Sequence, residues 1–206
     1  MGTIGLFLSG ATLFLNSLML LGKANGKSVA VFNLFIGTLQ VVTPFYLILV
    51  SDQSSLSIFN YGVTYLFGFT FLYFGVITLK GYDGNGLGWF SLWISIITIV
   101  YAIVAITRSQ DVLGMLTWIH WSFLWLLFFL TMTMKKAIDN FVGMVAQIQS
   151  WLTLTIPSLF SMLGIMEITW IRNLLIGALI LSIFIFIGSA WTLRKKTAIN
   201  AGPVHN

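Results

Sequence analysis

Long uncharged runs follow one another along this chain, and every charged residue lies between two runs or beyond them. The runs cover residues 1–22, 28–51, 53–79, 84–107, 112–134, 140–166 and 173–193. Each run has about 20 residues or more, enough for a helix to cross the roughly 30 Å of hydrocarbon in a bilayer. The pattern therefore predicts an all-α membrane protein with seven transmembrane helices.

The expected spans end at turn residues within these runs. They cover residues 4–21, 28–50, 59–79, 87–105, 113–134, 141–163 and 171–191. Residues 1–196 are expected to form a single transmembrane domain, and residues 197–206 a short C-terminal tail.

Composition supports this class and excludes most catalytic, metal-binding and ion-coupling functions. The chain is 58% hydrophobic and 7% charged, whereas a soluble domain carries about 25% charge. All five acidic residues lie outside the spans, which leaves no carboxylate for a proton relay or for ion coupling. The two His and the absence of Cys exclude a multi-residue metal site and a disulfide. With no catalytic motif either, we expect no enzyme, no metal and no cofactor.

Basic residues set the expected orientation, because cytoplasmic loops are the basic ones. Only Arg108 and Arg172 follow even-numbered spans. The residues that follow odd-numbered spans are Lys23, Lys27, Lys80, Lys135, Lys136, Arg194, Lys195 and Lys196. The N-terminus is therefore predicted outside and the C-terminus in the cytoplasm. The net charge of +5 reflects this topology and gives no reason to expect nucleic acid. No basic segment precedes the first span, so we expect no cleaved signal peptide.

Three of the eight Trp share one face of the fifth span. On a helix, Trp118, Trp121 and Trp125 fall within about 60° of arc, because each residue turns about 100°. They lie near the middle of an apolar span, where an interfacial belt of Trp does not account for them. Such a face either packs a core or lines a narrow slot.

The polar residues left inside the spans are neutral. A path lined by indoles, Phe rings, amides and hydroxyls suits a small, polar, uncharged solute, whereas an ion would lose its hydration shell without replacement. Gln149 is a candidate contact for such a solute. Asn16 either bonds a neighbouring helix or lines the path. His120 is either a neutral imidazole bonded to a neighbouring helix or a pore-side, pH-sensing group.

A short internal repeat suggests how the spans are arranged. The segment 8–12 resembles the segment 66–70, which lies 58 positions later, and the turns at 25–26 and 83–84 keep the same offset. Spans 1–2 and 3–4 therefore look like copies of one hairpin, and spans 5–6 have the same layout. Three hairpins can close a bundle around a central path, with the seventh span outside that pattern.

Several motifs in this order resemble those of the bacterial urea/amide channel family, the AmiS/UreI type. The third span contains Leu66-Phe67-Gly68-Phe69-Thr70-Phe71-Leu72-Tyr73. The fifth contains Trp118-x-x-Trp121-x-x-Leu124-Trp125. The sixth contains Gln149…Thr153…Ile156-Pro157, and Asn16 lies in the first.

The resemblance implies a homohexamer in the bacterial plasma (inner) membrane. Each protomer would be a twisted bundle of helical hairpins with its own pore, which passes urea or short amides passively through aromatic constrictions. By position, the constriction residues are Phe67, Phe71, Trp118, Trp121, Leu124 and Trp125. The aliphatic wall opposite matches Leu6, Ser9 and Leu13.

Three departures separate this chain from acid-gated members of the family. Gln149 stands where the acid-activated type has Glu, and Phe71 stands where it has Tyr. The loop at 51–57 is short and has no His. The amide-channel branch therefore fits better. The seventh span, 171–191, is additional to the six-helix urea channel and would reverse the side of the C-terminus.

The leading hypothesis is a facilitative channel for small neutral amides that supplies a cytoplasmic amidase or urease. The alternative is a membrane receptor or scaffold in which the Trp face is only a packed core. A coupled transporter is disfavoured by the lack of acids within the spans. Urea and acetamide are both small planar amides, and the choice between them stays open.

Overall fold

The computed structural model describes residues 2–200, with side chains through Arg194. All regular structure in this part of the chain is helical. The elements are α1 (Gly2–Leu20), α2 (Gly26–Val50), α3 (Ser55–Gly62), α4 (Thr64–Lys80), α5 (Asn85–Ser109), α6 (Val112–Met132), α7 (Asp139–Gln149), the π-helix η1 (Ser150–Thr155), α8 (Ile156–Met162) and α9 (Thr169–Asn200). The all-α prediction is confirmed.

Six of these helical stretches are long and apolar enough to cross a membrane. They are Gly2–Leu20, Gly26–Val50, Ser55–Lys80, Asn85–Ser109, Val112–Met132 and Thr169–Arg194. The stretch expected as the sixth span, 141–163, is built differently from the other six. It consists of α7, η1 and α8, which follow one another without interruption but are each too short to span a bilayer alone.

Pro157 gives the physical reason for the π-helix. A proline within a helix has no N–H to donate, and its ring clashes with the carbonyl four residues earlier. The preceding turns are widened, so that the N–H of Ile156 bonds the carbonyl of Trp151. The hydroxyl of Thr155 donates to the carbonyl of Ser150 at 2.7 Å. Wide turns of this kind are frequent at functional sites.

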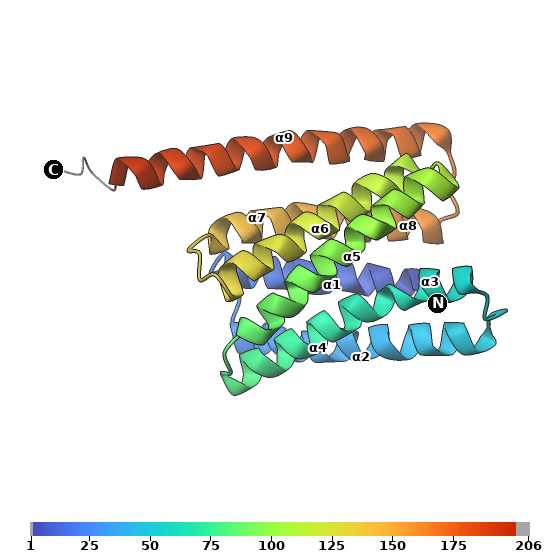
Figure 1. The fold of residues 1–206 in the computed structure, drawn as a ribbon, viewed down its shortest axis with the longest axis horizontal. Helices are drawn as coiled ribbons and strands as arrows, with labels where there is room; N and C mark the ends of the chain where they lie inside the picture. Colours follow the sequence, from blue (N-terminus) through green and yellow to red (C-terminus); the bar gives the residue numbers. More distant parts are fainter. Residues whose placement is uncertain (1, 201–206) are drawn as a thin grey trace.

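The helices lie alongside one another in a single bundle (Figure 1). The most extensive contacts join α2 to α4, α5 to α6, and α1 to the α7–η1–α8 stretch. Among the expected hairpins, α1 contacts α2 well, but α4 contacts α5 and α6 contacts α7 only sparsely. The tightest packing therefore pairs span 2 with span 3, span 4 with span 5, and span 1 with the sixth stretch. The expected hairpins had paired span 1 with 2, 3 with 4, and 5 with 6.

Small residues explain this shifted pairing. A Cβ at Gly68 of α4 would lie 3.0 Å from the Gln40 carbonyl of α2, and a Cβ at Gly10 of α1 would lie 3.1 Å from the backbone nitrogen of Thr155. On α6 the matching close approach is made by Ser122, which exchanges hydroxyl–carbonyl bonds of 2.8 Å with Ser95 of α5. Such small residues allow helix backbones to approach closely within a membrane.

Helix α9 packs along α6 on the outer side of the bundle. Ile171, Leu175 and Leu179 of α9 form a buried cluster with Leu113 and Leu116 of α6. At the start of α9, the guanidinium of Arg172 lies 2.9 Å from the carboxylate of Asp111. Helix α9 continues to Asn200, four residues into the segment expected as a tail, and residues 201–206 lie outside the described part.

Helix α1 begins and helix α9 finishes at opposite ends of the bundle (Figure 1). The turns that follow α1, α4 and α6 gather at the end where α9 finishes. There Lys135 donates to the carboxylate of Asp83 at 2.9 Å, which ties the α6–α7 turn to the α4–α5 turn. This hydrogen bond holds the pKa of Asp83 below its ordinary value. The basic loops counted in the sequence thus lie on one side.

The close approach of α2 and α4 can be tested with matched glycine substitutions. Gly68→Ala should lower the free energy of unfolding in detergent by about 1–3 kcal/mol, because the added methyl overpacks a backbone contact. Gly177→Ala on α9 has no atom within 4 Å of the new methyl. It should leave stability unchanged or raise it by up to about 1 kcal/mol through helix propensity. Equal unfolding midpoints for the two variants would contradict this packing.

Candidate functional site

A cavity of about 220 Å³ lies inside the bundle, enclosed by α1, α4, α5, α6 and the start of α7. Its wall is mainly apolar and aromatic, with a few amide and hydroxyl groups. The lining residues are Leu13, Asn16, Met19, Leu20, Phe67, Thr70, Phe71, Phe74, Leu87, Ser91, Trp121, Trp125, Phe128, Thr131, Met132 and Asp139.

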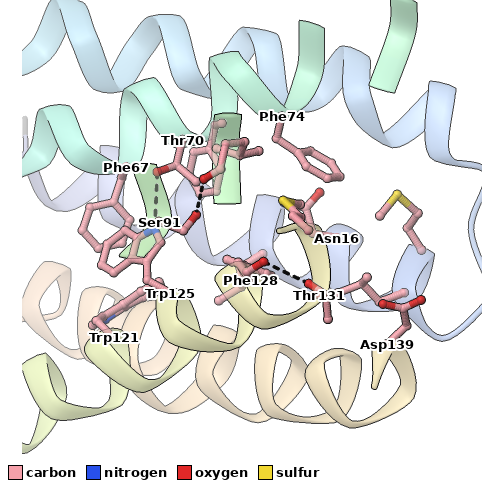
Figure 2. Close-up of a pocket in the computed structure, with 16 residues that line it drawn as sticks. Asn16, Phe67, Thr70, Phe74, Ser91, Trp121, Trp125, Phe128, Thr131 and Asp139 are labelled. Atoms are coloured by element: carbon pink, nitrogen blue, oxygen red, sulfur yellow. Dashed lines mark hydrogen bonds between the residues drawn. The ribbon is translucent and has the colours of Figure 1, made fainter. Parts of the chain in front are cut away.

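Three aromatic rings close one end of this cavity (Figure 2). The ring of Phe67 lies 4.5 Å from that of Trp121 and 5.1 Å from that of Trp125, in edge-to-face arrangements. The two indoles lie 5.3 Å apart. All three side chains are at most 4% exposed. Edge-to-face packing of this kind is favoured by the ring quadrupoles and makes a compact wall.

A hydrogen bond fixes the orientation of one of these indoles. The Nε1–H of Trp125 donates to the hydroxyl of Thr70 at 3.3 Å, as Figure 2 shows. Thr70 in turn donates to the carbonyl of Leu66 at 2.6 Å. The buried indole N–H is thereby paired, and the apolar rest of the ring is left facing the cavity.

The other end of the cavity lies at the turn between α6 and α7. Asp139, at the start of α7, is exposed and is the one charged residue on the described wall. Thr131 lies near it (Figure 2). The cavity therefore runs from this basic-loop side of the bundle to the aromatic cluster in its interior.

The lining positions follow the internal repeat of the sequence. Leu13 of α1, Phe71 of α4 and Trp125 of α6 each lie three residues after the small residue that packs its helix against a neighbour. Asn16, Phe74 and Phe128 lie six residues after it. The three odd spans thus present equivalent faces to one cavity.

Six of the residues singled out from the sequence line this cavity. They are Leu13, Asn16, Phe67, Phe71, Trp121 and Trp125. Asn16 also exchanges hydrogen bonds of 2.7 and 3.0 Å with Asn33 of α2, so it serves helix contact as well as the wall.

The other singled-out residues lie outside the cavity wall. Leu6 and Trp118 pack against the edge of the aromatic core, and Trp118 lies 5.0 Å from the ring of Tyr101. Leu124 is buried within that core. Ser9 is buried and bonded to Gln40, and the side-chain nitrogen of Gln149 donates to the His120 carbonyl at 3.0 Å.

The imidazole of His120 bonds the neighbouring helix α9 and does not touch the cavity. Its Nε2 lies 2.8 Å from the hydroxyl of Ser182, and its Nδ1 lies 2.7 Å from the carbonyl of Leu116. Because a carbonyl only accepts, Nδ1 carries the proton in the neutral ring. The single proton of the Ser182 hydroxyl is shared between two acceptors, Nε2 and the Leu179 carbonyl 2.7 Å away. The ring of Phe186 covers the imidazole at 6.0 Å. This arrangement matches the interpretation as a neutral, interhelical histidine.

Sequence reasoning did not single out several wall residues. Phe74 and Phe128 share the register of Asn16, so extending the repeat to the fifth span would have found them. Thr70 and Thr131 lie on the same faces of α4 and α6. Leu87 and Ser91 come from α5, and no sequence signal marks which even span reaches the cavity.

The described residues form an all-helical bundle with six membrane-length apolar helices and an internal cavity, which is the architecture of a multi-pass membrane protein. The sequence profile of the AmiS/UreI family transporters matches residues 1–165. The chain belongs to this family. The match ends before α9 begins.

Named relatives agree with this membership. The chain is 38% identical over 165 residues to a Rhodococcus erythropolis protein named as transporter protein AmiS2, covering 80% of each chain. It is 38% identical over the same length to an amidate substrates transporter protein of Mycolicibacterium smegmatis, covering 80% of this chain and 78% of the relative. It is 28% identical to the acid-activated urea channel of Helicobacter pylori, covering 72% of this chain and 91% of the relative.

Solved structures agree with the fold. The closed-state cryo-EM structure of the Helicobacter pylori urea channel matches with a TM-score of 0.72 at 28% identity, covering 79% of this chain and 98% of that one. The crystal structure of that urea channel matches with a TM-score of 0.70 at 29% identity, covering 80% and 98%. The chain is therefore a membrane channel or transporter, not an enzyme.

The hydrogen bond to the cavity indole leads to a stability test. Thr70→Val keeps the shape but removes the buried hydrogen-bond partner of the Trp125 N–H, which should lower the free energy of unfolding by about 1 kcal/mol. Thr98→Val is the matched control, because the hydroxyl of Thr98 bonds only carbonyls of its own helix. The measurement is the unfolding midpoint with tryptophan emission. Equal losses in both variants would show that the indole bond contributes nothing.

Proposed function

We propose that this protein is a facilitative channel for urea and short aliphatic amides. The observation that carries the proposal is the mainly apolar and aromatic cavity that ends at the Phe67–Trp121–Trp125 cluster, in a chain whose relatives are named for amides and urea. Planar amides can slide with their faces against aromatic rings, while their polar edges reach amide and hydroxyl groups. An ion would find nothing on this wall to replace its hydration shell except Asp139 at one end.

The proposed pore continues past the three rings toward the other end of the bundle. The wall of this second part would be formed by residues that the family resemblance assigns to the pore and that lie outside the cavity wall. They are Leu6, Ser9, Trp118, Leu124 and Gln149. The proposal of passive flow is supported by the absence of any carboxylate within the spans. No carboxylate there could couple solute movement to a proton.

The proposed membrane arrangement has seven crossings, with the α7–η1–α8 stretch as the sixth. The N-terminus lies outside and the C-terminus in the cytoplasm of a bacterial cell. Supporting this, α1 begins and α9 finishes at opposite ends of the bundle, and the Lys-rich turns share the end at which α9 finishes. A homohexamer that supplies a cytoplasmic amidase or urease completes the proposal. Gln149 and Phe71 favour the amide branch.

Solute flux into vesicles tests the function directly. Proteoliposomes should swell faster than protein-free liposomes in urea, acetamide and propionamide, with less acceleration in glycerol, which is not planar. The measurement is light scattering after rapid mixing, with all four solutes in one series. If protein and protein-free vesicles swell at the same rate in every amide, the channel proposal fails and the receptor or scaffold alternative is favoured.

The aromatic wall should set the size limit of the pore. Trp125→Ala removes a large ring, so the ratio of butyramide to acetamide flux should rise, because the opening widens. Trp93→Ala is the control, since Trp93 is 52% exposed on the outer surface of α5. If Trp125 is only core, its loss should cost about 3–5 kcal/mol of packing without changing the ratio. The comparison requires variants that remain folded and assembled.

A further inference from the structure

Two buried side-chain atoms stand apart from all others in the described chain, because neither has a hydrogen-bond partner there. They are the carbonyl oxygens of Gln40 and Gln149. Both residues are 0% exposed. Buried polar groups in proteins are almost always paired, and an unpaired one calls for a specific explanation. Here both unpaired atoms are of one kind, amide acceptors, and no buried donor among the described side chains is left over.

The side chain of Gln40 extends from α2 to α1 at the level of the aromatic cluster. Its nitrogen lies 2.7 Å from the hydroxyl of Ser9. Ser9 holds on α1 the register that Phe67 holds on α4 and Trp121 on α6. Ser9 and Leu13 lie one turn apart on the same face of α1, and Leu13 lines the cavity. Gln40 is thus placed where the three rings close the cavity.

The free oxygen of Gln40 lies beside bare backbone. A Cβ at Gly5 would collide with this oxygen, so glycine is needed one turn before Ser9 for the amide to reach its position. Because Gly5 has no Cβ, the acceptor oxygen of Gln40 can lie directly against the face of α1 that Gly5 and Ser9 form. Nothing in the packing of α1 against α2 requires so long a polar side chain, since Ser9 could be paired within its own helix.

Gln149 extends its side chain from α7 to α6. Its nitrogen donates to the carbonyl of His120, which can only accept, so the oxygen is necessarily the unpaired atom. His120 precedes Trp121 in α6, which keeps this amide near the same rings. Helices α2 and α7 both pack against α1. The two acceptors are therefore carried by two different helices, each of which packs against the cavity-lining helix α1.

We propose that Gln40 is a solute-binding, specificity-determining residue of the amide path. Its carbonyl oxygen accepts an N–H of the amide as the solute passes the rings, and Gln149 supplies the second acceptor. A primary amide carries two N–H donors, and urea carries four, which matches a pair of fixed acceptors without a matching donor. This inference rests on the proposed amide channel and adds the residue that recognises the amide nitrogen.

The test compares Gln40→Met with Gln147→Met in proteoliposomes. Both changes replace an amide by a thioether of similar length, but Gln147 faces the outer groove between α7 and α9 beside Trp151. Acetamide and water fluxes are measured on the same vesicles. The acetamide-to-water ratio should fall by about two- to tenfold in Q40M, as expected for one lost neutral hydrogen bond. In Q147M the ratio should stay at the wild-type value.

The controls separate this inference from the proposed function. If wild-type vesicles take up acetamide no faster than protein-free liposomes, the proposed function itself fails. If wild-type flux is present but Q40M keeps the wild-type ratio, or Q147M falls equally, Gln40 does not bind solute and the inference is overturned. Should Q40M not fold, Gln40→Asn withdraws the same oxygen by about one carbon–carbon bond, and its ratio must fall as well for the proposal to stand.

Discussion

A polar side chain in hydrocarbon has to find its hydrogen-bond partner inside the protein, and this constraint organises the whole bundle. Asn16 pairs with Asn33, Ser95 with Ser122, and His120 with Ser182, each across two helices. Every pair fixes one helix against another at one depth. Because the pairing is nearly complete, the two buried side-chain atoms left unpaired among the described residues become informative, and both are amide oxygens.

Small residues determine which helices approach one another most closely. Gly10, Gly68 and Ser122 let three odd spans approach three even ones, and each then presents its residues three and six positions later to a common interior. The repeated register brings Leu13, Phe71 and Trp125 together. A cavity with one aliphatic and several aromatic walls follows from three related helices whose lining residues have diverged. The differences among equivalent positions therefore give the cavity its aromatic wall, most of all through the indoles of α6.

The sequence was sufficient for whatever depends on charge and periodicity. Charges mark the ends of every membrane stretch, and the Trp spacing places the indoles on one face of α6. Features that depend on packing were not predictable. The π-helix before Pro157 divides the sixth stretch. Ser91 reaches the cavity from α5, although neither its residue type nor its spacing predicts this position. Gln40 looked like any polar residue in a span, because only the geometry shows that its oxygen has no partner.

The central claim is that a neutral amide reaches the buried rings, which a packed core would not allow. Acrylamide is itself a small planar amide that quenches indole fluorescence, so quenching of a protein that keeps only Trp121 and Trp125 tests the claim most directly. The other six Trp are replaced by Phe, and iodide serves as the charged quencher. Both indoles are nearly unexposed, at 4% and 2%. The account predicts efficient quenching by acrylamide and protection from iodide. Protection from both quenchers would contradict it.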